Sequence, residues 1–322
     1  MRARAAVAIL SLAVLPLVEA AQNFPEKPVR IITTFPSGSG PDAAMRLIAA
    51  RLSKAWGQQV VVDNRPGGNG FIGLGMARTA VPDGYTLAQA SSAQITTHRL
   101  IYRSLPYDPV KDFEAIVPLF RNHFFVVVPA SSSWKGVGDL IAAAKAKPNG
   151  FTYGSEFIGS PGHLGAASLE AATGTQMTHV PYKETGQLFA AVGRGDVQWA
   201  FGTAGTAGAA VQSGSARLLA LAAPRRLSSY PDVPTVSESG GPAGFEVAAW
   251  TGLLAPRGTP RAIVEQVNRD VARAVAEPEV RERFAAFGYE AWDITPAQTS
   301  AAMAAELRGH AGTIKRLNLQ LD

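Results

Sequence analysis

Residues that could do chemistry are concentrated in four turns rich in glycine and serine, each between a predicted strand and a helix start. The turns are "PSGSGPD" (Pro36–Asp42), "RPGGNGFIG" (Arg65–Gly73), "GSEFIGSPGHL" (Gly154–Leu164) and "PYKETGQ" (Pro181–Gln187). A helix start presents unpaired N–H groups and the positive end of a dipole, so it stabilises an anion. Glycine admits a ligand close to the backbone, and serine adds hydroxyl donors. Several such turns facing one cleft would hold a carboxylate without an arginine clamp.

Each turn also has an ordinary structural explanation. The first turn lacks the Gly-Lys-Ser/Thr ending of a nucleotide site. Any one of the four turns, taken alone, is typical of an ordinary connection between a strand and a helix. Asp42 is placed to N-cap the helix that follows it, and Pro161 suits the first turn of a helix capped by Ser160. Lys183 and Arg65 are near the predicted cleft, yet either could simply pair with a surface acid.

Catalytic readings have little support in the sequence. No two of the five histidines are spaced as a metal pair, and the chain has no cysteine. Ser160 and His163 are three residues apart but lack a Gly-x-Ser-x-Gly elbow, so we interpret His163 as a packing or capping residue. The "GTAGTAG" segment (Gly202–Gly208) resembles a phosphate cradle only by its glycine content. We therefore expect no enzyme, no metal and no cofactor, with a hydrolase using Ser160 and His163 as the enzymatic alternative.

Alternating strands and helices must position these turns. The helical pattern at Asp42–Trp56 and that at Arg261–Val275 have apolar residues on one face. Such alternation predicts α/β domains with largely parallel sheets, whose turns at the carboxyl ends of strands bind ligands. The predicted strands are Val29–Thr33, Val60–Asp63, Thr86–Ala90, Phe124–Pro129, Phe151–Tyr153, Met177–Val180, Val197–Phe201 and Leu218–Ala222, and the segment "EVAAWTGLLAP" also has strand character.

Two shifts in composition predict that the chain crosses between domains twice. The first is at Arg121–Ser133, where a core strand gives way to polar "SSSW", and the second is at the turn-rich Ser237–Phe245. The middle third is then inserted between two parts of the first domain. We predict lobe 1 at residues 21–122 and 245–322 and lobe 2 at residues 123–244, with the two crossings acting as a hinge.

The N-terminal segment predicts export. Residues 1–20 carry two arginines, then an apolar run too short to span a bilayer, then a Val-Glu-Ala ending. We expect this signal peptide to be cleaved after Ala20 and the product to be free in the periplasm, because no cysteine is present for a lipid anchor. The formal net charge is +5, without a basic run, so a nucleic-acid partner is not expected. We expect a monomer.

The motifs in their order resemble the substrate-binding proteins of tripartite tricarboxylate transporters, often called Bug-type receptors. The resemblance runs from about Pro25 to the C-terminal helices. It is carried by "FPSGSGPDAAMRLIA", "VVVDNRPGGNGFIG", "PDGYTL", "GSPGHLGAASLEAATGTQMTHVPYK", "GDVQWAF", "RRLSSYPDVPTVSESG" and "GLLAPRGTPRAIVEQVN".

This resemblance implies an α/β type II periplasmic binding protein, whose two lobes close on a small carboxylate. The ligand classes implied are di- and tricarboxylates, amino acids and aromatic acids, delivered to the membrane permease of a tripartite tricarboxylate transporter. The alternative is a receptor that presents its solute to a sensor kinase or a catabolic enzyme. The residues implied as ligand-binding are Pro36, Ser37, Gly38, Ser39, Asn69, Gly70, Ser91, Ser92, Ser160, Pro161, Gly162, His163, Tyr182 and Lys183.

The sequence departs from the family pattern at two turns. Glu156 and Phe157 stand where the family turn is small and rich in glycine, and Glu184 stands where the family has glycine after "VPYK". These three residues are added to the predicted ligand-binding set. We expect them to shift selectivity away from a plain tricarboxylate, towards a ligand with an apolar or aromatic body or an amino group. The alternative is that both glutamates face solvent and change nothing.

Overall fold

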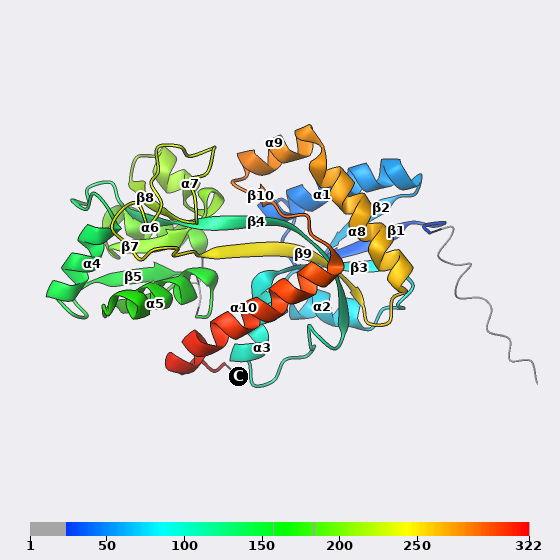
Figure 1. Ribbon diagram of the computed structural model, residues 1–322, viewed down its shortest axis with the longest axis horizontal. Coiled ribbons are helices and arrows are strands. Elements are labelled where there is room, and N and C mark those ends of the chain that lie inside the picture. Colours follow the sequence, from blue (N-terminus) through cyan, green and yellow to red (C-terminus); the bar gives the residue numbers. More distant parts are fainter. Residues whose placement is uncertain (1–23, 157, 183, 322) are drawn as a thin grey trace, which may run out of the picture.

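The computed structural model describes residues 24–156, 158–182 and 184–321. The predicted signal peptide, Phe157 and Lys183 lie outside the described residues. Within them the chain forms two α/β lobes joined by a pair of long strands (Figure 1). Lobe 1 contains β1–β3, α1–α3, α8 and α9, and lobe 2 contains β5–β8 and α4–α7. The predicted fold of two α/β lobes with a hinge is confirmed.

Lobe 1 is a parallel three-stranded sheet covered by helices. Strand β1 pairs with β2 on one side and β3 on the other. Helix α1 packs on this sheet through Met45, Ile48 and Leu52, which are almost completely buried, as their helical spacing predicts. The elements are β1 (Val29–Thr33), α1 (Gly40–Trp56), β2 (Val60–Asn64), α2 (Phe71–Arg78), β3 (Thr86–Ser91), α3 (His98–Ile101), α8 (Arg261–Ala276) and α9 (Pro278–Ala286).

Lobe 2 repeats this arrangement, again with the first of three parallel strands in the middle. Strand β5 pairs in parallel with β6 and β7, and two separate hydrophobic clusters involve its helices. Trp199 and Phe201 on β7 are buried in the cluster that also contains Leu140 of α4 and Leu169 of α5. The elements are α4 (Val137–Ala146), β5 (Thr152–Ser155), α5 (Pro161–Thr173), β6 (Thr178–Pro181), α6 (Thr185–Arg194), β7 (Trp199–Gly202), α7 (Ala204–Gln212) and β8 (Ala216–Ala222).

The crossing between the lobes is a ribbon of two antiparallel strands, β4 (Phe113–Pro129) and β9 (Ala248–Pro256). The prediction for β4 was too short, because it began at Phe124. Pro118 in the earlier half of β4 lies at a register shift in the ladder, where a missing N–H is tolerated. The sheet is therefore mixed, with antiparallel strands between two parallel sets. The predicted lobe boundaries fall within β4 and just before β9 and stay predictions.

The C-terminal helix α10 (Pro296–Arg316) runs diagonally beneath both lobes (Figure 1). It begins on lobe 1, and its far end reaches α5 of lobe 2. A small cluster of Ile101, Leu164 and Ile314 buries the contact between α3, α5 and α10. The short strand β10 (Glu290–Ala291) pairs with β4. The lobes are thus connected by packed helix contacts as well as by the two strands.

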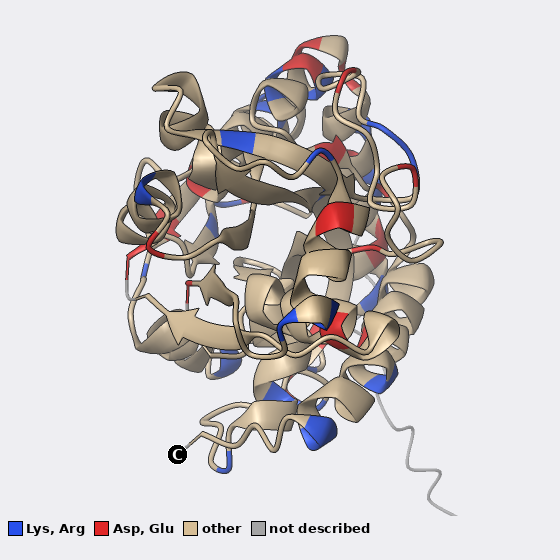
Figure 2. Cartoon of the chain, turned by 90° about the vertical axis from the view of Figure 1, so that its left-hand side faces the viewer, with Lys and Arg blue, Asp and Glu red and all other residues tan. Residues whose placement is uncertain are grey.

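Charged residues lie mainly on the outer helices and loops (Figure 2). In the part of the chain that the structure describes, no helix combines the length and the apolar character needed to cross a bilayer. Nor do residues 24–156, 158–182 and 184–321 bring together three side chains of the kinds that hold a metal ion.

Candidate ligand-binding cleft

A cavity of about 800 Å³ lies where the two lobes and the crossing strands meet. Lobe 1 contributes the start of α1, the end of β3 and the segment after α9. Lobe 2 contributes Glu156 after β5 and the starts of α5 and α7. The middle of the wall comes from β4 and β9. Segments from both halves of the chain therefore surround one space, of a size found in ligand sites.

On the lobe 1 side, Ser39, Gly40 and Pro41 line the cavity at the first turn of α1. Ser39 is the N-cap: its Oγ accepts a hydrogen bond from the Asp42 N–H (3.4 Å) and donates one to the Pro36 carbonyl (2.7 Å). The prediction that Asp42 is the N-cap is wrong, because the helix begins two residues earlier, at Gly40. The opening turn thus presents a helix start to the cavity.

Asp42 instead stabilises the turn before α1 through hydrogen bonds to its side chain. Its buried carboxylate accepts hydrogen bonds from Gly38 N (2.8 Å), Asn64 Nδ2 (2.8 Å) and Arg46 Nε (3.1 Å). Burial alone would raise the pKa of Asp42, but the hydrogen bonds from Asn64, Arg46 and Gly38 outweigh it and lower the pKa. Asp42 is therefore an ionised structural residue, and it does not line the cavity.

Gln94 ties together the ends of the three parallel strands of lobe 1. Its Oε1 accepts hydrogen bonds from Thr34 Oγ1 (2.8 Å) and Ser91 N (2.9 Å), and its Nε2 donates to the Asn69 carbonyl (3.1 Å). Ser91 lines the cavity, and the neighbouring Ser92 does so while its Oγ accepts the Trp250 N–H (3.3 Å). One buried amide thus fixes the turns that follow β1, β2 and β3.

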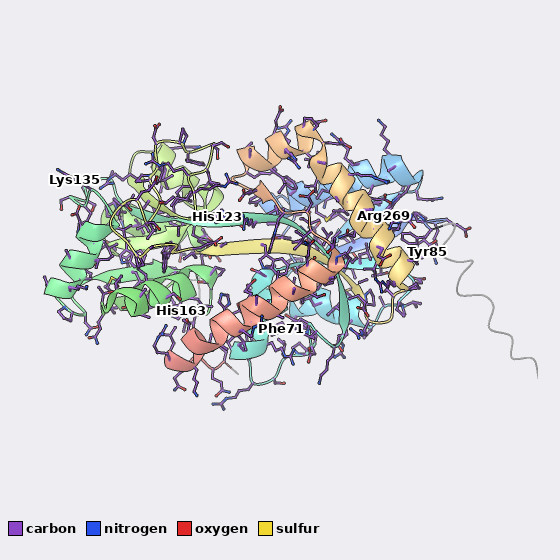
Figure 3. The ribbon with its side chains drawn as sticks, in the orientation of Figure 1. Phe71, Tyr85, His123, Lys135, His163 and Arg269 are labelled. Atoms are coloured by element: carbon purple, nitrogen blue, oxygen red, sulfur yellow. The ribbon has the colours of Figure 1, made fainter. Side chains whose placement is uncertain are left out.

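On the lobe 2 side, the start of α5 contributes Pro161. Ser160 is the N-cap, and its Oγ accepts a hydrogen bond from His163 N (3.2 Å), as predicted for a cap followed by proline. His163 is buried and its Nδ1 accepts a hydrogen bond from Gly159 N (2.9 Å), while its ring stacks on His179 at 4.0 Å. Burial lowers the pKa of His163 to about 4. His163 is therefore a packing residue of α5 (Figure 3), neutral at physiological pH.

The start of α7 is a second helix N-terminus on the lobe 2 side, within the "GTAGTAG" segment to which the sequence analysis gave no binding role. Residues 203–206 line the cavity. Thr203 is the N-cap of a reciprocal capping box with Thr206: Thr206 N donates to Thr203 Oγ1 (3.1 Å), and Thr203 N donates to Thr206 Oγ1 (2.8 Å). The signal was available, because threonines three residues apart follow a predicted strand and precede an apolar helical run.

Aromatic side chains make up much of the remaining wall. They come from the crossing strands, from the segment after α9 and from loops of both lobes. Phe120 of β4 stacks on Tyr289 with 4.0 Å between ring centroids, so these rings form one rigid surface. The sequence could not reveal this wall, because its members are far apart along the chain. The aromatic lining residues are Phe35, Phe120, Phe124, Tyr230, Trp250, Phe287 and Tyr289.

The cavity lining has little formal charge. Among the described residues no lysine or arginine lines the cavity, and Glu156 is its one carboxylate. Burial raises the pKa of Glu156. On strand β4, Arg121 Nε and His123 Nε2 lie 3.2 and 3.3 Å from a Glu290 carboxylate oxygen. An anion placed in this cleft would therefore meet N–H groups at helix starts and neutral side chains.

Of the predicted site residues, the structure brings five to the cavity: Ser39, Ser91, Ser92, Glu156 and Pro161. The others that the structure describes are outside the lining. They divide into residues adjacent to these turns and residues of the two remaining turns, and their role in ligand binding stays a prediction. They are Pro36, Ser37, Gly38, Ser160, Gly162 and His163 in the first group and Asn69, Gly70, Tyr182 and Glu184 in the second.

The turns at Asn69 and Glu184 have structural contacts of their own. Asn69 Nδ2 donates a hydrogen bond to Tyr102 Oη (2.7 Å), and a Cβ at Gly70 would lie 2.0 Å from Gln94 Nε2. Glu184 is exposed at the N-cap position of α6. Tyr182 packs against the lobe 2 cluster that includes Leu188. These two turns therefore support neighbouring loops and helices.

Comparison with known proteins agrees with this architecture. A protein from Cupriavidus necator, described as "UPF0065 protein in gbd 5'region", is 34% identical over 316 residues, covering 98% of this chain and 95% of its own. The solved structure "R. palustris Rpa4515 with adipate" superposes with a TM-score of 0.80 at 31% identity, covering 92% of this chain and 99% of its own.

A second solved structure is "MatC (Rpa3494) from Rhodopseudomonas palustris with bound malate", with a TM-score of 0.74 at 27% identity, covering 90% of this chain and 100% of its own. The family model described as "Tripartite tricarboxylate transporter family receptor" matches residues 44–319. The predicted family and its periplasmic binding protein fold are thereby confirmed. This chain belongs to the tripartite tricarboxylate transporter receptor family.

Proposed function

We propose that this protein is a periplasmic receptor that captures a small carboxylate between its lobes and delivers it to a membrane transporter. The observation that carries the proposal is the shared cavity, which has the start of α1 on one side and the starts of α5 and α7 on the other. A carboxylate placed among these N–H groups is stabilised by three helix dipoles, and no arginine is required. The adipate and malate in the two related structures are small carboxylates of this kind.

Closure follows from the position of the ligand. A solute that contacts both lobes binds the closed form better than the open form, so it shifts the population towards closure. The ribbon of β4 and β9 is the segment that must bend, because it carries the chain between the lobes. The closed receptor is the form offered to the transporter. Presentation to a sensor kinase or a catabolic enzyme would use the same binding step.

A substitution that fills the cavity tests the proposal. Gly205, the second residue of α7, lines the cavity, and a Cβ there would meet only Thr203 Oγ1, at 3.9 Å. Gly205→Phe therefore adds a ring to the binding space without strain in the helix. Gly312→Phe is the control, because Gly312 is an exposed helical glycine outside the cavity, with no atom within 4 Å of its Cβ position.

We expect malate, adipate or a related acid to raise the melting temperature of the wild type in a concentration-dependent manner. The ligand should raise the melting temperature of Gly312→Phe as much as that of the wild type. Gly205→Phe should show no rise with ligand, although its melting temperature without ligand should match that of the wild type. Equal ligand responses in all three proteins would place the site elsewhere. No response of the wild type to any acid in a broad panel would contradict the proposed function.

A further inference from the structure

Glu156 occupies an unusual position for a receptor of acids. It directly follows β5, the strand of lobe 2 that pairs with both β6 and β7, and its side chain lies in the cavity wall. Because Glu156 is the first residue after β5, its backbone position is fixed by the sheet and its carboxyl group cannot easily leave the cavity. The carboxyl group of Glu156 is therefore held in the same space as the helix starts.

Glu156 has no cationic partner among the described residues. No described lysine or arginine forms an ion pair with it, and none lines the cavity. The other acids near the cleft are paired: Glu290, for example, lies within ion-pair distance of Arg121 and Arg225. A carboxylate in a partly desolvated wall without a counterion is costly. A ligand that supplies the missing positive charge removes this cost.

The lining separates the two kinds of interaction that a zwitterion requires. Helix starts favour an anionic group, whereas Glu156 favours a cationic one. The aromatic side chains between them, which include Phe120 and Trp250, suit an apolar chain and present ring faces that also attract a cation. A second carboxylate near Glu156 would meet like charge.

Resting on the proposed function, we propose that the cleft selects carboxylic acids that carry a protonated nitrogen, with the carboxylate at the helix starts and the nitrogen at Glu156. Glu156 is then the residue that determines specificity. Glu156 is suited to this role because it lines the cavity and directly follows β5.

The test compares ligands of one chain length. Adipate and 6-aminohexanoate both have six carbons and differ in having a carboxylate or an ammonium at the second end, while hexanoate has neither. Affinities for all three are measured by isothermal titration calorimetry at neutral pH on the wild type, Glu156→Gln and Glu156→Asp. Glu282→Gln is the control, because Glu282 is an exposed acid on α9 outside the cavity.

We expect the wild type and Glu282→Gln to bind 6-aminohexanoate at least about tenfold more tightly than adipate, the size of one charge-assisted hydrogen bond. Glu156→Gln should abolish or reverse this ratio, and Glu156→Asp should retain part of it.

Two results would overturn this inference, and they are distinguishable. If adipate binds as tightly as 6-aminohexanoate and Glu156→Gln leaves the ratio unchanged, Glu156 does not select a cation, although the receptor function stands. If the wild type binds none of the three ligands and no other acid in a broad panel, the proposed function fails and this inference fails with it.

Discussion

The replacement Asp42→Asn tests how the lobe 1 side of the cleft is built. The Asp42 side chain is 2% exposed and accepts three hydrogen bonds, two at Oδ2 from Gly38 N and Arg46 Nε and one at Oδ1 from Asn64 Nδ2. An asparagine of the same shape keeps one oxygen and turns the other position into a donor. Depending on the amide orientation, either the two bonds at Oδ2 or the one bond at Oδ1 is lost.

The expected cost follows from these contacts. A hydrogen bond to a buried charged group contributes about 1.5–3 kcal/mol, and Arg46, about half exposed, adds little. Asp42→Asn should therefore lower the free energy of unfolding by about 2–4 kcal/mol, and the melting temperature by about 4–8 °C for a chain of this size. The affinity for the best carboxylate should fall as well, because the turn before α1 is no longer fixed.

Urea unfolding at pH 7 measures the effect, with Asp139→Asn as the matched control. Asp139 also accepts a hydrogen bond from a backbone N–H four residues earlier, that of Lys135 (2.6 Å), but it is exposed, so its replacement should cost less than about 1 kcal/mol. The folded-state pKa of Asp42 is lowered, so its contribution is present above about pH 4 and is lost as the pH falls further. Equal costs for the two variants would refute the structural role of Asp42.

Two further predictions concern the loops and the buried histidines. Gly70→Ala should destabilise the protein and weaken carboxylate binding, because Gly70 has a positive φ of 92° and a Cβ there would displace the Gln94 amide. Thermal denaturation measures the loss of stability, and a ligand titration measures the loss of affinity. An unchanged affinity would count against the role of Gln94. Burial lowers the pKa of His163 to about 4, so protonation favours the unfolded state and the free energy of unfolding should fall from about pH 6.5 to pH 4, by up to about 3 kcal/mol. His163→Gln should flatten this decline in urea unfolding, and an equally steep curve would contradict the assignment.

Local patterns were sufficient to predict several elements of the fold. Strand β1 begins and ends as its apolar run predicts, and α1 ends at Trp56 because Gly57 takes the left-handed conformation. The cap at Ser160 was also predictable, because serine followed by proline is a local signature of a helix start. Sequence reasoning succeeded where neighbouring residues alone determine the conformation.

The parts that could not be predicted depend on contacts between distant segments. Strand β4 continues through Arg121 and Asn122 because β9 pairs with it there, 129 and 127 positions later in the chain, at Trp250 and Ala249. The aromatic wall likewise combines residues such as Phe35 and Tyr289. Which of four similar turns face the cavity depends on the packing of the lobes, and their sequences alone do not contain that information.

A crystal structure of the protein with its tightest-binding acid tests the central claim most directly. The account predicts a carboxylate between the lobes, within hydrogen-bond distance of N–H groups at the starts of α1, α5 or α7, and none of the described lysines or arginines in contact with it. A carboxylate bound to basic residues on one lobe, outside the cavity beside β4 and β9, would contradict the account.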